Sequence, residues 1–215
     1  MQYIENDKNA LIVKKIIQSI HENAKYLSEI DGETGDGDHG INMNKGFLIA
    51  DERIQDEDSF SDALKILGRT LIMDIGGSMG PIYGTLFSKL SYTLKDREKI
   101  TADIFEEAIN NAKNGLMDLA GARPGDKTLV DTIIPAYESF KRSNQSEYNF
   151  SECLDAMSNG AEEGKESTKA MVAKVGRAAR LGERSRGHLD AGATSCYIIL
   201  CSMAIGMKEQ MKEIE

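Results

Sequence analysis

Apolar residues recur at spacings of three and four along almost the whole chain, and this periodicity restricts the possible folds more than any other feature. A first run contains Leu11, Ile12, Ile16, Ile20, Ala24 and Leu27. Such spacing places apolar side chains on one face of an amphipathic helix. Similar runs cover 43–54, 64–75, 82–90, 105–119 and 130–140, and further helices are expected over about 150–173 and 191–211. No segment alternates convincingly with period two, so the sequence predicts an all-α fold.

Three residues indicate where some of these helices begin or bend. Pro81 suits the first turn of a helix, where its missing N–H group costs nothing. Thr101 suits the N-cap of the next helix. Pro135 lies inside a helical run and should bend that helix or shift its start. Because no internal repeat and no Ser- or Pro-rich linker divides the chain, we expect a single domain over residues 1–215.

Composition excludes several classes of function. Hydrophobic residues make up 40% of the 215 residues, which is enough for a core, and the net charge of −9 disfavours nucleic acid or an anionic membrane as a partner. The longest nearly apolar run, 196–206, is too short to span a bilayer. The N-terminus lacks the pattern of a signal peptide, and the three cysteines include no Cys-x-x-Cys. We therefore expect a cytoplasmic protein.

Glycine is concentrated in four loops between the helical runs, namely 31–40, 76–84, 121–125 and 176–192. A simple helix stop needs one glycine. Several glycines beside charged residues indicate a backbone shaped around a ligand.

The first glycine-rich loop contains three aspartates, Asp31, Asp36 and Asp38, within a span of eight residues. Converging carboxylates repel one another unless a cation lies between them, and ligation by oxygen alone favours Mg²⁺ or Ca²⁺ over Zn²⁺. An EF-hand is excluded, because counting from Asp31 puts Asp36 at its glycine position and Asn42 at its glutamate position. A Mg²⁺ site facing phosphate is the favoured interpretation, and a solvated acidic turn is the alternative.

Two other loops suit phosphate binding. Residues 76–81 end one helix and begin another, so free N–H groups at the new helix start could bind an anion, although a plain helix–helix turn gives the same pattern. The segment 121–128 is not a Walker A loop, because Asp126 separates Gly125 from Lys127 and the preceding segment is helical.

The segment 165–188 has a net charge of +5, whereas the rest of the chain has −14. Such a segment on an acidic protein suits a polyphosphate or an acidic protein partner. Of the three histidines, His21 is expected to be structural or at the surface. His39 is expected to contact phosphate or the metal shell, with a phosphohistidine role as the alternative, and His188 could be oriented by Asp190.

Four strings in this order resemble the nucleotide-binding L subunit of the dihydroxyacetone kinase family. They are GDGDHGINMNKGF (35–47), GGSMGPIYGTLF (76–87), PGDKTLVDTIIPA (124–136) and GRAARLGERSRGHLDAGATS (176–195). The resemblance implies a barrel of eight antiparallel helices that binds a nucleotide at one end. Two Mg²⁺ ions would be held by Asp31, Asp36 and Asp38. The nucleotide, ADP or ATP, would be contacted by His39, Gly40, Ile41, Asn42, Ser78, Met79, Gly121, Leu129, Arg177, Asp190, Gly192, Ala193 and Thr194.

The resemblance also implies a reaction. In the phosphotransferase-dependent members, ADP stays bound, an M-type subunit phosphorylates it from phosphohistidine, and the phosphoryl group passes to dihydroxyacetone on a K-type subunit. Such transfer needs mainly positioning and charge neutralisation, so the absence of an evident general base is no objection. A nucleotide-sensing regulatory module and a kinase subunit for a related small ketose are the alternatives.

Two residues depart from the family pattern. Met79 stands where family members commonly have a serine, and Ala191 stands where they commonly have a proline. Met79 lacks the hydroxyl with which a serine could contact phosphate, but the backbone N–H group of Met79 could still do so.

Overall fold

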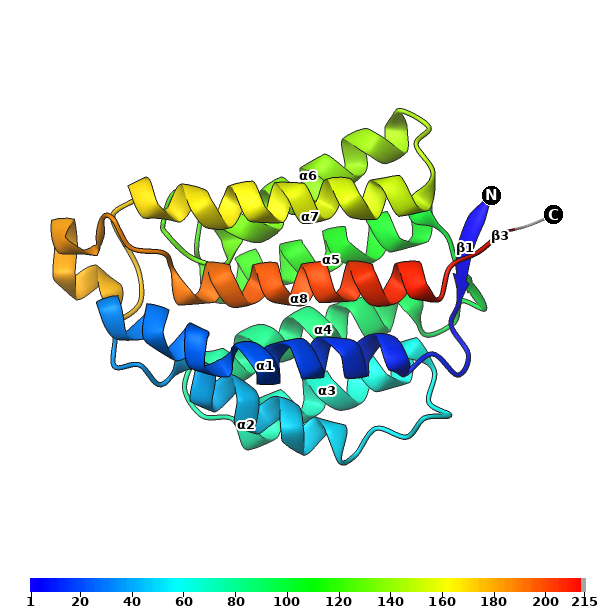
Figure 1. Ribbon diagram of the computed structural model, residues 1–215, viewed down its shortest axis with the longest axis horizontal. Helices are drawn as coiled ribbons and strands as arrows, with labels where there is room; N and C mark the ends of the chain where they lie inside the picture. The colour runs from blue at the N-terminus through cyan, green and yellow to red at the C-terminus, as the bar shows by residue number, and fades with distance from the viewer. Residues whose placement is uncertain (214–215) are drawn as a thin grey trace.

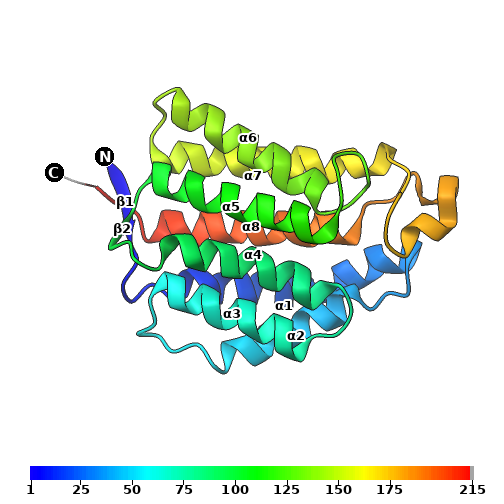
Figure 2. The same cartoon turned by 180° about the vertical axis from the view of Figure 1, so that it is seen from behind.

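The computed structural model describes residues 1–213, and eight α-helices follow one another within that range. They are α1 (Leu11–Thr34), α2 (His39–Asp51), α3 (Phe60–Asp74), α4 (Met79–Leu94), α5 (Ala102–Ala120), α6 (Val130–Gln145), α7 (Phe150–Ser167) and α8 (Ala191–Glu209). Each helix packs against the next along the chain, and α8 packs back against α1. This closes the barrel of antiparallel helices that Figures 1 and 2 show from opposite sides, and it confirms the predicted all-α fold.

The apolar faces predicted from the sequence line the interior of this barrel. Ile12, Ile16, Ile20 and Leu27 of α1 are all fully buried. α8 is buried on most of its surface, because α1, α6 and α7 all pack against it. This helix is long and apolar enough to cross a membrane by length and composition, but 72% of the apolar window lies inside the protein. It is therefore a core helix of the barrel.

Local hydrogen bonds explain where several helices begin and end. Thr101 caps α5 as predicted, since its hydroxyl accepts the Ile104 N–H. Pro81 is the third residue of α4 and Pro135 lies inside α6, which begins at Val130. The helix expected over 150–173 ends earlier, at Ser167, and a 3₁₀ turn (η1, Thr168–Ala170) follows it. The hydroxyls of Ser167 and Thr168 bond back to carbonyls three residues earlier and compete with helical bonding.

A small antiparallel sheet, which the sequence did not predict, lies at the end of the barrel where the chain termini are (Figure 1). Its order is β2-β1-β3, with β1 at Gln2–Glu5, β2 at Lys99–Ile100 and β3 at Lys212–Glu213. Strands of two to four residues are too short to show alternation in the sequence, so pattern reasoning missed them.

The alternating direction of the helices decides where the loops lie. The junctions α1–α2, α3–α4, α5–α6 and α7–α8 must all lie at the end of the barrel away from the sheet. These are the junctions that carry the four glycine-rich loops of the sequence. The fold therefore brings together loops that are up to about 150 residues apart in the chain.

Helices α6 and α7 approach closely because α7 presents two glycines to α6. A Cβ atom added to Gly160 would lie 2.5 Å from the Pro135 carbonyl oxygen, and one added to Gly164 would lie 2.3 Å from the Asp131 carbonyl oxygen. Backbone atoms cannot move aside as a flexible side chain can. The packing of α6 on α7 thus depends on the lack of a side chain at both positions.

We predict that Gly160→Ala lowers the free energy of unfolding by about 1–3 kcal/mol, because the new methyl group collides with backbone. Gly115→Ala is the matched control. Its Cβ would lie 3.0 Å from the flexible end of Lys89, so the gain in helix propensity of up to about 1 kcal/mol should dominate. Urea unfolding of both variants measures the difference. Equal stability of the two variants would contradict this account of the α6–α7 contact.

Candidate nucleotide site

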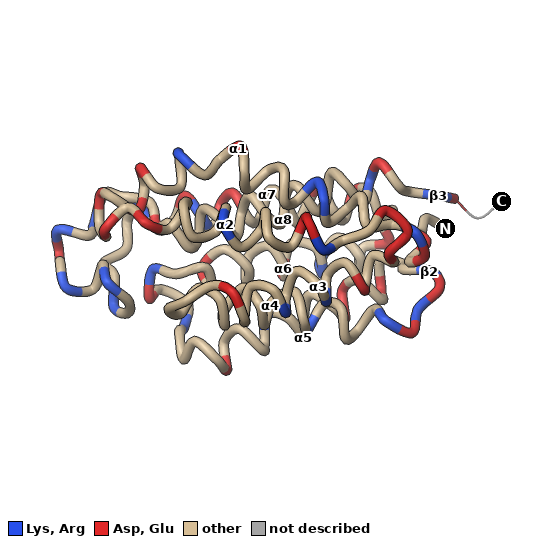
Figure 3. The backbone as a smooth tube through the Cα atoms, turned by 90° about the horizontal axis from the view of Figure 1, so that it is seen from below, with Lys and Arg blue, Asp and Glu red and all other residues tan. Residues whose placement is uncertain are grey.

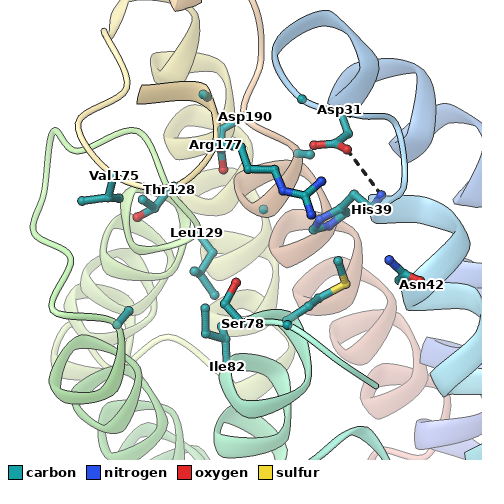
Figure 4. A pocket seen from close by; sticks show the side chains of 18 of the residues that line it. Asp31, His39, Asn42, Ser78, Ile82, Thr128, Leu129, Val175, Arg177 and Asp190 are labelled. Carbon is teal, nitrogen blue, oxygen red and sulfur yellow. Dashed lines mark hydrogen bonds between the residues drawn. The ribbon is translucent and has the colours of Figure 1, made fainter. Parts of the chain in front are cut away.

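A cavity of about 540 Å³ lies at the end of the barrel where the four glycine-rich junctions meet (Figure 4). Eleven of the residues predicted from the sequence line it: Asp31, Asp36, Asp38, His39, Asn42, Ser78, Met79, Leu129, Arg177, Asp190 and Gly192. They come from every second junction of the barrel, so the tertiary structure assembles one cavity from segments that are distant in the sequence.

Three carboxylates converge on one side of this cavity. One oxygen from each of Asp31, Asp36 and Asp38 lies within 4.8 Å of the others. Asp31 was expected in a loop, but it lies in the last turn of α1, because Gly32 does not end that helix. Gly37 has a φ of +75°, a conformation that favours glycine, where the chain turns from Asp36 to Asp38. A donor set made only of carboxylate oxygens fits a hard divalent cation such as Mg²⁺.

Arg177 reaches two of these carboxylates from the segment between α7 and α8. Its guanidinium pairs with Asp36 and lies 3.8 Å from the Asp38 carboxylate. A fixed positive charge beside three carboxylates reduces their mutual repulsion and can also bind a phosphate oxygen. Figure 3 shows other basic residues along this segment, at the left end of the molecule.

Two helices begin at the cavity without a side-chain cap. The N-cap residues are Asp38 for α2 and Ser78 for α4, and neither side chain accepts a hydrogen bond from its own helix. The first N–H groups of a helix have no partner within the helix, and the helix dipole is positive there. These two helix starts can therefore bind the oxygens of a phosphate group beside the carboxylates.

His39 connects the carboxylates to the floor of the cavity. Its backbone N–H donates to Asp31 over 3.4 Å, and its ring Nε2 lies 2.8 Å from the Ser195 hydroxyl. Burial lowers the pKa of His39 to about 4, against the opposing effect of the Asp31 charge, so the ring is neutral at neutral pH. It can orient a ligand by hydrogen bonding, without adding positive charge.

Tyr83 and Ser195 complete this buried network, and sequence reasoning missed both. The Tyr83 hydroxyl donates to the Gly192 carbonyl over 3.1 Å and also bonds to the Ser195 hydroxyl. Tyr83 lies four residues after Met79, so its place on the same face of α4 was the signal that could have indicated it.

The side of the cavity opposite the carboxylates is apolar. Ile82, Leu119, Leu129 and Val175 line it, and Figure 4 shows Ile82, Leu129 and Val175 away from Asp31. Of these four, only Leu129 was predicted as a contact. The cavity thus has one end for a cation and phosphate groups and another for an apolar ring such as a nucleobase.

Five predicted contacts lie outside the cavity lining. Gly40 packs against α1, since an added Cβ would lie 1.8 Å from the Ala24 carbonyl oxygen, and Ile41 is 66% exposed on the outer surface. Gly121 ends α5 with a φ of +59°, between Ala120 and Ala122, which do line the cavity.

The other two, Ala193 and Thr194, hold the start of α8. The Ala193 N–H and the Thr194 hydroxyl both donate to Asp190, over 2.7 and 2.8 Å. Asp190 does not orient His188 as expected, because the His188 ring lies 3.0 Å from Glu33 and bonds to it through Nδ1. Burial raises the pKa of Asp190 to about 6.

Comparison with known proteins shows the family of this chain. Residues 33–205 match the family model described as the DAK2 domain. The chain belongs to the DAK2 domain family. It is 38% identical over 189 residues to the "PEP-dependent dihydroxyacetone kinase, ADP-binding subunit DhaL" of Escherichia coli, covering 86% of this chain and 90% of that protein.

A second relative is the D-erythrulose kinase of Mycolicibacterium smegmatis, 32% identical over 183 residues, which cover 83% of this chain and 31% of that protein. Among solved structures, the dihydroxyacetone kinase of C. freundii in complex with AMP-PNP and Mg²⁺ matches with a TM-score of 0.68. The match covers 92% of this chain and 33% of the other at 22% sequence identity, so it supports the fold.

We predict that Asp190→Asn becomes more stable than the unmodified protein as pH rises. The folded-state pKa of Asp190 lies above its unfolded value, so ionisation of its carboxyl disfavours the folded state and the unmodified protein loses stability as pH rises through this range. The advantage of the variant should grow from near zero at pH 4 to as much as about 3 kcal/mol at pH 7. Urea unfolding of the metal-free proteins across this range measures it. A difference in stability between Asp190→Asn and the unmodified protein that does not change with pH would contradict a raised pKa of Asp190 in the folded state.

Proposed function

We propose that this chain is the ADP-binding subunit of a phosphotransferase-dependent dihydroxyacetone kinase. The observation that carries the proposal is the convergence of three carboxylates beside two uncapped helix starts, in a cavity whose far side is apolar. This combination suits a metal-bound nucleoside diphosphate. The similarity to the E. coli ADP-binding subunit, which extends over most of both chains, supports the same conclusion.

In this proposal, Asp31, Asp36 and Asp38 hold two Mg²⁺ ions, which neutralise the phosphate charge when bound. Residues 39–42 at the start of α2 and Ser78 and Met79 at the start of α4 lie along the phosphates, and the N–H groups without a helical partner there bind the phosphate oxygens. The Asn42 N–H is bonded to the Asp38 carbonyl, so Asn42 contributes its side chain, which lines the cavity. Met79 needs only its backbone for this purpose, so the missing hydroxyl does not prevent binding. Arg177 adds a positive charge beside the phosphates, and Leu129 with the apolar side of the cavity receives the base.

The chain acts together with two partners. An M-type subunit phosphorylates the bound ADP from a phosphohistidine, and the resulting ATP passes its terminal phosphoryl group to dihydroxyacetone on a K-type subunit. Residues 1–215 act as one nucleotide-binding domain in the cytoplasm, without nucleic acid or membrane as a partner. The chain itself positions the nucleotide and neutralises its charge, and these are the main requirements of phosphoryl transfer.

A related ketose is the second candidate for the acceptor. The 32% identity to a D-erythrulose kinase favours this alternative. Because the K-type subunit binds the acceptor, the nucleotide site is the same in both cases.

We predict that Asp36→Asn lowers the affinity for Mg-ADP by about 100-fold or more, because one ligand of the cation loses its charge. In the unmodified protein, Mg-ADP should raise the melting temperature, since it binds only the folded state. This shift should disappear in Asp36→Asn while the helix content stays unchanged. Glu57→Gln is the matched control, an exposed carboxylate far from the cavity. Equal melting shifts in both variants would exclude the assigned metal site.

We also predict that the purified protein carries about one ADP per chain, which denaturation releases for measurement by chromatography. Reconstitution with K- and M-type subunits should phosphorylate dihydroxyacetone, and omission of the M-type subunit should abolish the reaction. Preferential phosphorylation of erythrulose would favour the second candidate. Freely exchanged ATP and transfer without an M-type subunit would indicate a conventional kinase and would contradict the relay.

A further inference from the structure

Lys127 is a buried lysine that the proposed function does not use. It lies in the loop between α5 and α6, it is 1% exposed, and its φ of +64° is uncommon for a residue with a side chain. Burial of an ammonium group is costly unless hydrogen bonds satisfy it. Accordingly, burial lowers the pKa of Lys127 below its ordinary value, although the charge of Asp190 opposes the shift.

Backbone carbonyl groups surround the Lys127 ammonium. Its Nζ donates to the carbonyl oxygens of Thr168, Ser185 and His188 over 2.9, 2.7 and 2.6 Å. The Met171 carbonyl lies further away, at 3.4 Å. Three short bonds use all three hydrogens of the ammonium group, so Lys127 has no donor left for a phosphate oxygen.

The acceptors lie at the two ends of one segment, residues 168–188, which we call the lid segment. Thr168 and Met171 are at its beginning, and Ser185 and His188 are at its end. These two ends together form the base of the lid segment. Two further hydrogen bonds join them: the Gly187 N–H donates to the Lys169 carbonyl, and the Ala173 N–H donates to the Ser185 hydroxyl. The Lys127 ammonium thus lies at the centre of the hydrogen bonds that hold the two ends of the lid segment together. We call this set of bonds the clasp.

The middle of the lid segment reaches the cavity. Val175, Gly176, Arg177 and Ala178 line it, and Arg177 pairs with Asp36. Exposure increases toward this part, since Val175 is 38% exposed whereas Thr168 and Ser185 are fully buried. The part of the lid segment that faces the ligand therefore has little packing of its own and depends on its base for its position.

We propose that Lys127 is a positioning residue that fixes the lid segment over the nucleotide and thereby slows nucleotide release. This inference rests on the proposed function for its ligand, while the clasp itself is a property of the nucleotide-free chain. With the base closed, Arg177 and Val175 stay at the cavity. Without the ammonium group, three buried carbonyl groups lose their donor, the two ends of the lid segment separate, and the cavity opens.

The test compares Lys127→Met with Lys174→Met in the full chain. Lys174 belongs to the lid segment, but its side chain is 62% exposed and forms an ion pair with Asp126 over 3.4 Å. Hydrogen exchange of the nucleotide-free proteins measures protection of the Ala173 and Gly187 amides. Release of ribose-labelled fluorescent ADP with Mg²⁺, chased with excess ADP, measures residence time.

Lys127→Met should accelerate amide exchange in the lid segment and nucleotide release by about tenfold or more, while exchange in the barrel helices stays unchanged. Lys174→Met should stay within about twofold of the unmodified protein in both measurements. If Lys127→Met also leaves both rates within about twofold, the proposal is wrong. An unmodified chain that binds no ADP would contradict the proposed function instead, and amide exchange would still test the clasp.

Restoring the ammonium group separates its role from simple packing. Lys127→Cys treated with 2-bromoethylamine regains an ammonium on a side chain of lysine length and should recover slow release. The same treatment of Lys127→Met, which reaches only the native cysteines, is the control and should change nothing. Failure of the modified variant to recover would contradict a role for the charge.

If Lys127→Met does not fold, Ser185→Ala provides a milder test. It removes the hydroxyl that accepts the Ala173 N–H and leaves Lys127 in place. We expect release to accelerate about two- to fivefold, since one of several bonds across the base is lost. An unchanged release rate would overturn the proposal.

Discussion

Negative charge concentrated at one helix junction is the constraint on which the rest of the site depends. Three carboxylates that lie within 4.8 Å of one another repel unless positive charge lies between or beside them. Within residues 1–213, Arg177 supplies part of that charge from the segment between α7 and α8. The starts of α2 and α4 add the positive ends of two helix dipoles. The site is therefore arranged for a ligand that carries cations and phosphate together.

The two ends of the barrel differ in the groups that they bury. The apolar faces of the helices form one buried core along the barrel, and the short sheet joins the terminal segments at one end. The other end contains unusual buried groups: a neutral histidine at position 39, an aspartate with a raised pKa at position 190, and the clasped ammonium of Lys127. Each of these groups costs stability by burial, and the apolar core offsets that cost.

Two basic residues, one inside the lid segment and one in the loop before α6, show a similar contrast. Arg177 lies beside the carboxylates, whereas the Lys127 ammonium is hydrogen-bonded to backbone carbonyl groups of the segment, through which we propose that it acts. A surface arginine and a buried lysine thus contribute to one function through different physical means. The first supplies charge, and the second supplies position.

The sequence by itself determined the helices, the acidic trio and the glycine-rich loops, because periodicity and local spacing depend only on neighbouring residues. It also indicated a family resemblance from which eleven of the residues that line the cavity followed. Only the tertiary structure decided that α1 continues through Asp31, that Ala193 and Thr194 hold Asp190, and that Lys127 closes the lid segment. Each of these depends on burial or on partners distant in the chain. The Lys127 ammonium meets carbonyl groups 41 to 61 residues away, and no local pattern records such a contact.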